Sequence, residues 1–332
     1  MAILVTGAAG FIGAATADAL LGAGEQVIGI DSLNPYYDPA LKQARIDRVA
    51  AKYGDAFRFL KVDFCDVAAL RAAIGGAAIH CIVHLGAQAG VRHSIDHPEA
   101  YIQSNLVGHA NVLELARERR VAHFVYASSS SVYGANRSLP FRVEDRVDHP
   151  ISLYAATKKA DELLSEAYAN LYRLPMTGLR FFTVYGPWGR PDMAMWRFTH
   201  ALLSEAPLPL YNGGEMRRDF TYIDDIVAGV VACISRPPVD DGTVKAGGSE
   251  APHALYNLGN SRSEDLMRVV EVLERATGAK AMLSPQPMQP GDVKDTYADI
   301  GAATRDLGFE PQVSIDEGIP RFVAWYRDYH QL

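Results

Sequence analysis

The first 180 residues alternate between two patterns of hydrophobic positions. Short runs rich in β-branched and aromatic residues are typical of strands, and longer stretches with apolar residues every three or four positions are typical of helices. The strand-like runs are Ala2–Thr6, Gln26–Ile30, Phe57–Val62, Cys81–Leu85, His123–Ala127 and Met176–Phe181. The clearest helical stretches are Phe11–Ala23, Ile102–Ala116 and Leu163–Leu171. This alternation predicts an α/β fold built on a doubly wound parallel sheet with helices on both faces.

The alternation ends after about residue 180. Glycine, proline and aspartate are concentrated in Tyr185–Asp192, Pro207–Gly214 and Arg236–His253, which we interpret as loops. Helical spacing returns over Ser263–Thr277. We therefore predict a larger domain of residues 1–180, to which about 217–238 returns. The rest of 181–332 is expected to form a smaller C-terminal α/β domain.

Composition excludes several classes of function. The 332-residue chain carries a net charge of −7, so it lacks the basic surface of a nucleic-acid-binding protein and would be repelled by an anionic membrane. No stretch reaches the ~18 apolar residues of a membrane helix, and the N-terminus lacks the basic region of a signal peptide. The three cysteines form no C-x-x-C pair, which argues against disulfides and zinc. We expect a cytoplasmic protein that binds neither nucleic acid, nor membranes, nor metal.

A glycine-rich turn joins the first predicted strand to the first predicted helix. Gly7, Gly10 and Gly13 follow the spacing G-x-x-G-x-x-G, with Phe11 and Ile12 between the last two. Glycines in such a turn let the backbone approach a pyrophosphate, and the free N–H groups of the helix N-terminus can bind its phosphates. The turn therefore predicts a dinucleotide site.

Two carboxylates close the strands beside this turn. Asp31 ends the second strand, where it would accept hydrogen bonds from the adenosine ribose hydroxyls. Its charge would repel a 2′-phosphate, so we expect NAD rather than NADP. Asp63 closes the third strand and is either a contact to adenine or a loop carboxylate that caps a helix.

A serine cluster, a tyrosine and a lysine form a second candidate set. Tyr154 and Lys158 stand at i and i+4, where they share one face of a helix. The ammonium would stabilise a phenolate and make the tyrosine a usable general base. Ser128–Ser131 closes the fifth strand, at the edge where open α/β sheets bind ligands. A tyrosine–lysine pair is common by chance, but the dinucleotide turn upstream favours a catalytic role.

These residues resemble the extended short-chain dehydrogenase/reductase family, in particular its NAD-dependent epimerases and dehydratases of nucleotide sugars. The resemblance covers essentially the whole chain, and it implies a Rossmann-type NAD-binding domain followed by a nucleotide-sugar-binding domain. It implies that Ser129, Tyr154 and Lys158 are catalytic, with Ser130 and Ser131 as alternatives to Ser129. The residues that it implies as NAD contacts are Gly7, Gly10, Phe11, Ile12, Gly13, Asp31, Asn34, Asp63, Leu85, Ala87, Asn105, Tyr154 and Lys158.

The family pattern also implies a reaction. Tyr154 takes a proton from the sugar's 4-hydroxyl while a hydride leaves C4 for the nicotinamide, and the 4-keto sugar turns over before the hydride returns. Dehydratases of the family carry an Asp-Glu pair where Ser130 and Ser131 stand here, which favours 4-epimerisation. The alternatives are a UDP-galactose 4-epimerase and, in a different class, a non-catalytic NAD-binding regulator.

The implied substrate carries a carboxylate. The segment Thr183–Ala194 resembles that of UDP-glucuronate 4-epimerases, and an arginine such as Arg190 suits bidentate binding of a uronate. The positions implied as substrate contacts are Gln88, Arg92, Ser129, Thr183, Arg190, Tyr211, Arg218 and Asp292. The helices at Tyr101–Arg119 and Leu153–Tyr172 resemble those that pair as a four-helix homodimer interface. The expected partners are thus a UDP-sugar and a second copy of the chain.

Overall fold

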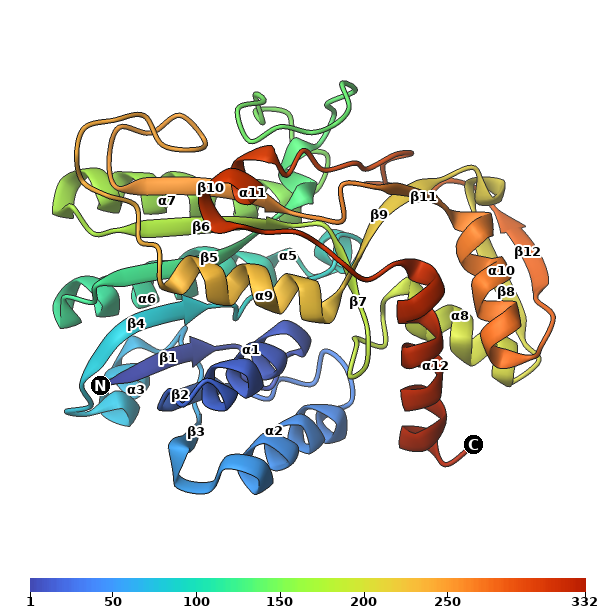
Figure 1. Ribbon diagram of the computed structural model, residues 1–332, viewed down its shortest axis with the longest axis horizontal. Helices are drawn as coiled ribbons and strands as arrows, with labels where there is room; N and C mark the ends of the chain where they lie inside the picture. The colour runs from blue at the N-terminus through green and yellow to red at the C-terminus, as the bar shows by residue number, and fades with distance from the viewer.

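A parallel sheet of seven strands forms the centre of the computed structural model, which describes residues 1–332 (Figure 1). In spatial order its strands are β10 (His253–Leu258), β6 (Met176–Phe181), β5 (His123–Ser129), β4 (Ile79–His84), β1 (Ala2–Thr6), β2 (Val27–Asp31) and β3 (Phe57–Lys61). Every neighbouring pair is parallel. The order reverses between β1 and β4, the kind of switch point at which open α/β sheets bind ligands. The predicted doubly wound fold is confirmed.

Helices cover both faces of this sheet (Figure 1). The first face carries α1 (Phe11–Gly22), α2 (Pro39–Tyr53) and α9 (Ile223–Ile234), and the second carries α3 (Val67–Ile74), α6 (Gly108–Arg119) and α7 (Leu153–Tyr172). Between β4 and α6 the chain forms α4 (His93–Asp96), α5 (Pro98–Tyr101) and a π-helical turn, Ile102–Val107. The helix predicted over Tyr101–Arg119 therefore changes its winding before Gly108.

A second region stands beside the carboxyl ends of the strands. It holds a three-stranded sheet of β7 (Thr183–Tyr185), β9 (Arg217–Tyr222) and β11 (Ser263–Asp265), and a pair formed by β8 (Pro207–Tyr211) and β12 (Met282–Gln286). Its helices are α8 (Ala194–Leu203), α10 (Leu266–Thr277), α11 (Gly301–Leu307) and α12 (Ile315–His330). Short 3₁₀ turns lie at Gly54–Ala56, Ser130–Tyr133 and Asn212–Gly214.

Two predictions for this second region are wrong in detail. Pro207–Gly214 is not all loop, because its first five residues form β8 and pair with β12, about 75 residues further along the chain. The helix predicted over Ser263–Thr277 begins only at Leu266, because the three preceding residues pair with β9. In both places pairing with a distant strand overrides the local pattern.

Returning segments connect the two regions. The stretch 217–238, expected to rejoin the first domain, contains α9, which packs against α1. The sheet also takes its seventh strand, β10, from residues 253–258, beyond the segments that the sequence assigned to it. None of the helices combines the length and hydrophobicity needed to span a membrane.

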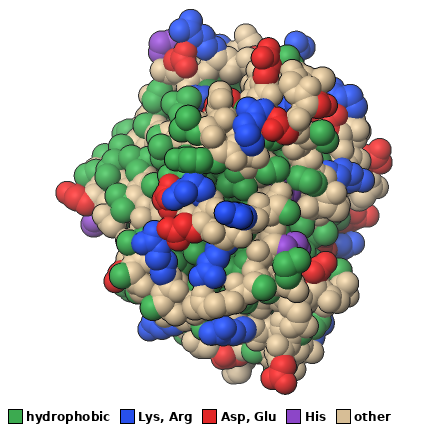
Figure 2. All heavy atoms as spheres, turned by 90° about the vertical axis from the view of Figure 1, so that its left-hand side faces the viewer, with side chains coloured by type: hydrophobic (Ala, Val, Ile, Leu, Met, Phe, Trp, Pro, Cys, Tyr) green, Lys and Arg blue, Asp and Glu red, His purple; other side chains and the backbone are tan.

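The end of the molecule shown in Figure 2 carries two kinds of surface. Hydrophobic side chains gather along one side of this view, while Lys, Arg, Asp and Glu side chains are mixed near its centre. The helix α7 contributes three large exposed hydrophobic side chains, those of Leu163, Leu171 and Tyr172. Leu163 and Leu171 are eight residues apart and share one side of the helix, and exposed apolar side chains that share a side are typical of an interaction surface.

Candidate active site

A cavity of about 960 Å³ opens where the chain leaves β1, β2, β4 and β5 and extends to the second region. All but one of the residues singled out from the sequence line it. From the first region these are Gly7, Gly10, Phe11, Ile12, Gly13, Asp31, Asn34, Asp63, Leu85, Ala87, Gln88, Arg92, Ser129, Tyr154 and Lys158. From the second region they are Thr183, Arg190, Tyr211, Arg218 and Asp292.

The exception is Asn105, which is buried behind the cavity wall. Its side-chain amide donates to the Gln88 carbonyl (3.1 Å) and the Thr157 hydroxyl (2.9 Å), and its carbonyl accepts from the Gln88 N–H (2.8 Å). These contacts fix the loop after β4 against α7. The structure therefore gives Asn105 a positioning role at this site.

The glycine turn has no room for side chains. Gly7 adopts a φ of +67°, and a Cβ there would lie 2.7 Å from the Gly86 Cα. A Cβ on Gly13 would lie 2.0 Å from the Gly7 carbonyl oxygen. No side chain caps the start of α1 at Gly10, so its first N–H groups are left to bind a ligand in the cavity. The turn thus fits a dinucleotide pyrophosphate.

Asp31 stands at the end of β2, beside this turn. Its carboxylate accepts the N–H groups of Ala9 (3.1 Å) and Leu33 (2.8 Å). These bonds hold the carboxylate at the cavity edge and leave lone pairs for a ribose. Asp63 is exposed, and its carboxylate accepts the Cys65 N–H (2.9 Å).

Lys42, a lysine of α2, also lines the cavity and was not predicted from the sequence. Its ammonium donates to the Asn34 backbone carbonyl (2.7 Å) and side-chain carbonyl (2.6 Å). Burial lowers the pKa of Lys42, and the charge of Asp31 opposes that effect. The available signal was the Asp38-Pro39 pair, which is typical of a helix start and would have placed Lys42 on the first turn of a helix.

Tyr154 and Lys158 lie in the first two turns of α7. The helix begins there because the Ser152 hydroxyl accepts the Ala155 N–H (3.1 Å) as an N-cap. Lys158 is only 3% exposed, and its ammonium donates to the Ala127 carbonyl (3.1 Å) and to the Asp161 carboxylate (2.9 Å). Burial lowers the pKa of Lys158, but the charge and hydrogen bond of Asp161 together with the charges of Tyr154 and Glu162 outweigh this and keep the pKa raised. A permanent buried cation beside a tyrosine is suited to stabilising a phenolate.

The serines at the end of β5 have different hydrogen-bond partners. Ser128 donates to Glu162 (2.7 Å), whose carboxylate is buried in an ion pair with Arg180 (2.8 Å). The Ser129 hydroxyl instead donates to that of Ser131 (3.1 Å) and accepts the Ser131 N–H (3.1 Å). Both Ser129 and Ser131 line the cavity, so either hydroxyl can reach a bound ligand.

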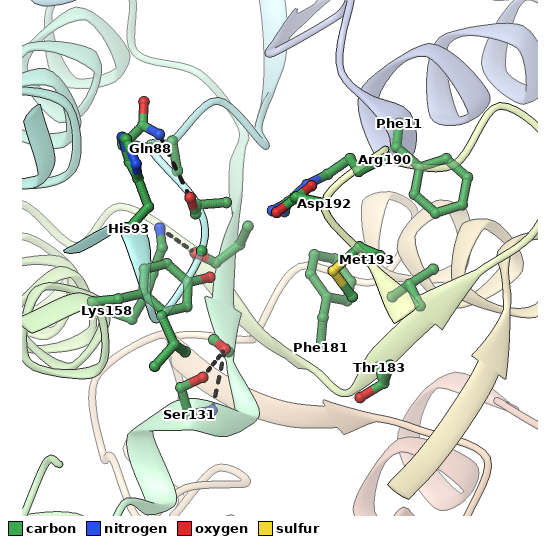
Figure 3. Close-up of a pocket in the computed structure, with 18 of the residues that line it drawn as sticks. Phe11, Gln88, His93, Ser131, Lys158, Phe181, Thr183, Arg190, Asp192 and Met193 are labelled. Atoms are coloured by element: carbon green, nitrogen blue, oxygen red, sulfur yellow. Dashed lines mark hydrogen bonds and ion pairs between the residues drawn. The ribbon is translucent and has the colours of Figure 1, made fainter. Parts of the chain in front are cut away.

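Arg190 and Asp192 lie across the cavity from Lys158 and Ser131 (Figure 3). Arg190 donates through Nε (3.0 Å) and Nη2 (2.5 Å) to the two oxygens of Asp192, which also accepts the Tyr36 hydroxyl (3.0 Å). Burial lowers the pKa of Arg190, but Asp192 outweighs this and keeps it raised. The pairing of Arg190 with Asp192 was not predicted from the sequence, although an opposite charge two residues away was a signal for it.

The far end of the cavity gathers the remaining predicted substrate contacts. Arg92 donates to Asp292 (2.7 Å), and its guanidinium lies 4.2 Å from the ring centroid of Tyr211. Arg218 donates to the carbonyls of Arg217 (2.9 Å) and Lys294 (2.8 Å). Burial lowers the pKa of Arg218, which marks a cation without full compensation by carboxylates. This end can therefore bind an anionic ligand that also presents a flat ring.

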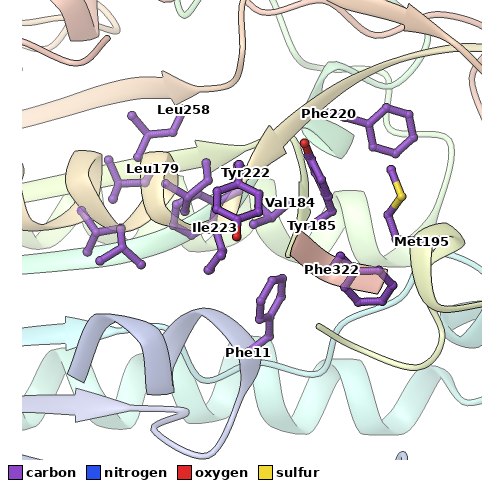
Figure 4. Close-up of a cluster of buried hydrophobic side chains, with 14 of the residues drawn as sticks. Phe11, Leu179, Val184, Tyr185, Met195, Phe220, Tyr222, Ile223, Leu258 and Phe322 are labelled. Carbon is purple, nitrogen blue, oxygen red and sulfur yellow. The ribbon is translucent and has the colours of Figure 1, made fainter. Parts of the chain in front are cut away.

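A cluster of buried hydrophobic side chains supports the wall of the cavity (Figure 4). Phe11 of α1, Val184 of β7 and Phe220 of β9 belong to this cluster and also line the cavity. Met195 and Phe322 extend the cluster to α8 and α12. The two regions thus share one core, which fixes the second region against the glycine turn.

Comparison with known proteins relates this site to a family. Residues 3–247 match the family model described as the NAD dependent epimerase/dehydratase family. The chain is 45% identical to a probable UDP-glucuronate 4-epimerase of Rhizobium meliloti, over 98% of this chain and 97% of that protein. It is 40% identical to UDP-glucuronate 4-epimerase 1 of Arabidopsis thaliana, over 99% of this chain and 77% of that protein.

A solved structure agrees with this relationship. The crystal structure of UDP-glucuronic acid 4-epimerase from Bacillus cereus, in complex with UDP-glucuronic acid and NAD, resembles this fold with a TM-score of 0.87. The two chains are 32% identical, and the match covers 99% of this chain and 100% of the other. This chain belongs to the NAD dependent epimerase/dehydratase family.

Proposed function

We propose that this protein is an NAD-dependent isomerase that interconverts UDP-glucuronate and UDP-galacturonate by 4-epimerisation, through a transient 4-keto sugar. The observation that carries the proposal is the composition of one cavity. It holds the glycine turn, the set of Ser129, Tyr154 and Lys158, and Arg190 on the opposite wall. Each part serves one requirement of the reaction: a cofactor, a proton carrier and a counter-charge for the uronate.

The chain's own residues would hold NAD at one side of the cavity. Gly7, Gly10 and Gly13 bring the backbone and the N-terminus of α1 to the pyrophosphate, with Phe11 and Ile12 alongside. When bound there, NAD would supply a reversible acceptor for the hydride of the sugar C4. The residues proposed for the rest of the cofactor are Asp31, Asn34, Asp63, Leu85, Ala87, Tyr154 and Lys158, with Asn105 acting through the Gln88 loop.

Proton transfer at the 4-hydroxyl falls to the catalytic set. Tyr154 accepts the 4-hydroxyl proton in the oxidative half of the reaction and returns it in the reductive half. Lys158 stabilises the phenolate, and its bond to Asp161 (2.9 Å) holds the ammonium in place. Ser129 bridges to the reacting oxygen, with Ser131 as the alternative because the two hydroxyls are hydrogen-bonded to each other (3.1 Å).

The other wall binds the UDP-sugar. We assign the diphosphate to Arg218, and the uridine to the Arg92, Tyr211 and Asp292 cluster. We assign the uronate carboxylate to Arg190, whose Nη1 is the one guanidinium nitrogen that no bond to Asp192 uses. The remaining proposed sugar contacts are Gln88 and Thr183.

A product assay with the purified protein tests this proposal. We expect UDP-glucuronate to give UDP-galacturonate at equilibrium and UDP-galactose to turn over far more slowly. Turnover of UDP-galactose alone would favour a UDP-galactose 4-epimerase and would contradict the assignment of the uronate carboxylate to Arg190. Failure to convert either sugar, with NAD bound, would favour a non-catalytic NAD-binding regulator.

We also propose that the protein is a cytoplasmic homodimer. Leu163 of α7 is 59% exposed and Leu171 is 72% exposed, and Ile102 and Val107 of the neighbouring π-helical turn are each 41% exposed. Pairing α6 and α7 with their counterparts in a second copy would bury these side chains in a four-helix bundle.

A further inference from the structure

Arg45, a residue of α2, is completely buried yet lies outside the lining of the cavity. All five N–H groups of its guanidinium are used. Nε donates to the Trp188 carbonyl (3.1 Å), and Nη2 donates to the carbonyls of Trp188 (2.6 Å) and Gly189 (3.0 Å). Nη1 donates to the Ala9 carbonyl (3.0 Å) and the Tyr37 hydroxyl (2.6 Å). One side chain therefore joins the glycine turn to the loop that follows β7.

None of the four acceptors of these five bonds is a carboxylate. A buried guanidinium normally needs an anionic partner, because moving a charge out of water is costly. Burial lowers the pKa of Arg45. Tyr37 opposes this most, and the charge of the nearest carboxylate, Asp31, opposes it less and without a hydrogen bond. The planar guanidinium can hold several acceptors in fixed positions at once, and we take this to be the role of the buried cation.

The loop that receives these bonds lacks secondary structure of its own. Gly186 adopts a φ of +144° and Trp188 a φ of +65°, a conformation that a residue with a Cβ rarely adopts. In this loop Arg45 binds the carbonyls of Trp188 and Gly189, the two residues that precede Arg190. Arg45 thus holds the backbone from which Arg190 reaches into the cavity.

The orientation of Arg190 is completed on its other side. Asp192 accepts two of its N–H groups, and Tyr36 donates to the same carboxylate (3.0 Å). Tyr36 and Tyr37 both belong to the loop between β2 and α2, and Arg45 binds the second of them. The guanidinium of Arg190 is therefore fixed from two directions, with Nη1 left for a ligand.

We infer that Arg45 is a positioning residue for substrate specificity, which sets Arg190 to bind the carboxylate of the sugar. This inference rests on the proposed function, because it needs a uronate as the ligand of Arg190. It predicts that Arg45 contributes to the affinity for UDP-glucuronate only while Arg190 is present. It also predicts a small contribution to the affinity for UDP, which lacks the carboxylate.

A double-mutant cycle on the NAD-loaded protein tests the inference. Dissociation constants for UDP-glucuronate and for UDP are measured by calorimetry for the wild type, Arg45→Met, Arg190→Met and the double variant. We expect Arg45→Met to weaken the affinity for UDP-glucuronate at least tenfold and the affinity for UDP less than twofold. In the Arg190→Met background the further loss for UDP-glucuronate should be less than twofold. An equal loss in both backgrounds, or an equal loss for both ligands, would overturn the inference.

Two further variants distinguish the positioning role of Arg45 from effects of lost charge or of disturbed folding. Lys52→Met removes a cation from the same helix, but Lys52 contacts only Asp18 and Tyr53, so both affinities should stay within twofold of the wild type. Arg45→Lys keeps the charge without the fork, and we expect at least a threefold loss for UDP-glucuronate. If Arg45→Met does not fold, Arg45→Lys replaces it in the cycle, and a wild-type affinity for Arg45→Lys would refute the inference.

Failure of the proposed function gives a different result. In that case the wild type itself would bind UDP-glucuronate no more tightly than UDP, and Arg190→Met would change neither affinity. A wild type that prefers UDP-glucuronate through Arg190, combined with an Arg45→Met variant of unchanged preference, would refute only the role of Arg45.

Discussion

At the scale of single residues, the cavity places a fixed charge on each of two opposite walls. Lys158 is bonded to Asp161, and Arg190 is bonded to Asp192, so each cation is oriented by a carboxylate that the sequence places within three residues. Oriented charges cost little reorganisation when charge develops on a ligand, which is what a site for proton transfer requires. Within the proposed catalytic set, Tyr154 is the group to which we assign the proton transfer.

Tyr154→Phe tests this assignment. The change removes the phenolic oxygen and leaves the ring, so we expect the variant to retain NAD while kcat falls by about 10²–10⁴-fold, the usual contribution of a general base. The measurements are the NAD content of the purified protein and the initial rate of UDP-glucuronate conversion. Tyr168→Phe alters a tyrosine of the same helix outside the cavity and should keep the wild-type rate. Full activity in Tyr154→Phe would contradict the mechanism.

At the scale of elements, the start of α7 connects stability to the site. The Ser152 hydroxyl caps the helix by accepting the Ala155 N–H (3.1 Å), and Tyr154 lies within this first turn. Losing an N-cap of this kind typically costs about 1 kcal/mol. A frayed first turn would also loosen Tyr154 relative to Lys158, which lies one turn further along the helix.

Ser152→Ala should therefore reduce both stability and rate. We expect the free energy of unfolding in urea to fall by about 1 kcal/mol and kcat to fall several-fold. Ser152→Asn restores a cap acceptor and should recover most of both losses. If Ser152→Ala loses activity at unchanged stability, then the hydroxyl acts on a ligand rather than on the helix.

Elements with local signals were predictable from the sequence, whereas elements that depend on distant partners were not. The strands Ala2–Thr6 and Met176–Phe181 have the bounds that their patterns predicted, and the helix Leu153–Tyr172 has the bounds that the family resemblance implied. β8 was missed because Pro207 and Pro209 suppress the strand signal, and only its pairing with β12 reveals it. β10 was missed because its place in the sheet is set by β6, which lies far upstream.

The same distinction holds for the site. The glycine turn and the Tyr154–Lys158 pair were visible because their spacing is local, and the structure brings both to one cavity. The clamp of Arg45 on Trp188 joins residues 143 positions apart, so no local pattern reveals it. The burial of Asn105 behind the wall was equally invisible, because only the packing of α7 determines it.

At the scale of the whole molecule, the exposed face of α7 makes dimerisation testable. We expect the wild type to elute with twice the chain mass of 36.2 kDa in size-exclusion chromatography with light scattering. Leu163→Glu places a charge where the second copy would pack and should give the monomer mass. Met282→Glu, which changes an equally prominent hydrophobic residue on β12, should leave the mass unchanged. A monomeric wild type would contradict the proposed four-helix interface.

The buried histidines of the first region should make the whole fold sensitive to mild acid. Burial holds the pKa of His109 at about 3 and lowers that of His123 to about 4, and burial also holds the pKa of His84 well below its usual range. The folded protein keeps these rings neutral, while the unfolded chain protonates them below about pH 6.5. Because the unfolded state then binds more protons, stability is lost progressively as the pH falls from about 6.5 toward 3. Buried Asp161 and Asp219, whose pKa values burial raises to about 6, oppose part of this loss.

His109→Gln isolates one of these histidines from the opposing carboxyls. His109 contacts the Ser165 hydroxyl (3.0 Å), a bond that an amide can replace. One ring that stays neutral when folded accounts for about 1.4 kcal/mol between pH 7.5 and 5.5. The free energy of unfolding in urea should therefore fall over this interval by about 1.4 kcal/mol less in His109→Gln than in the wild type. Exposed His149→Gln is the control and should show the wild-type pH dependence. Identical pH dependence in His109→Gln and the wild type would mean that His109 takes up a proton in the folded protein as readily as in the unfolded chain, and that it does not contribute to acid sensitivity.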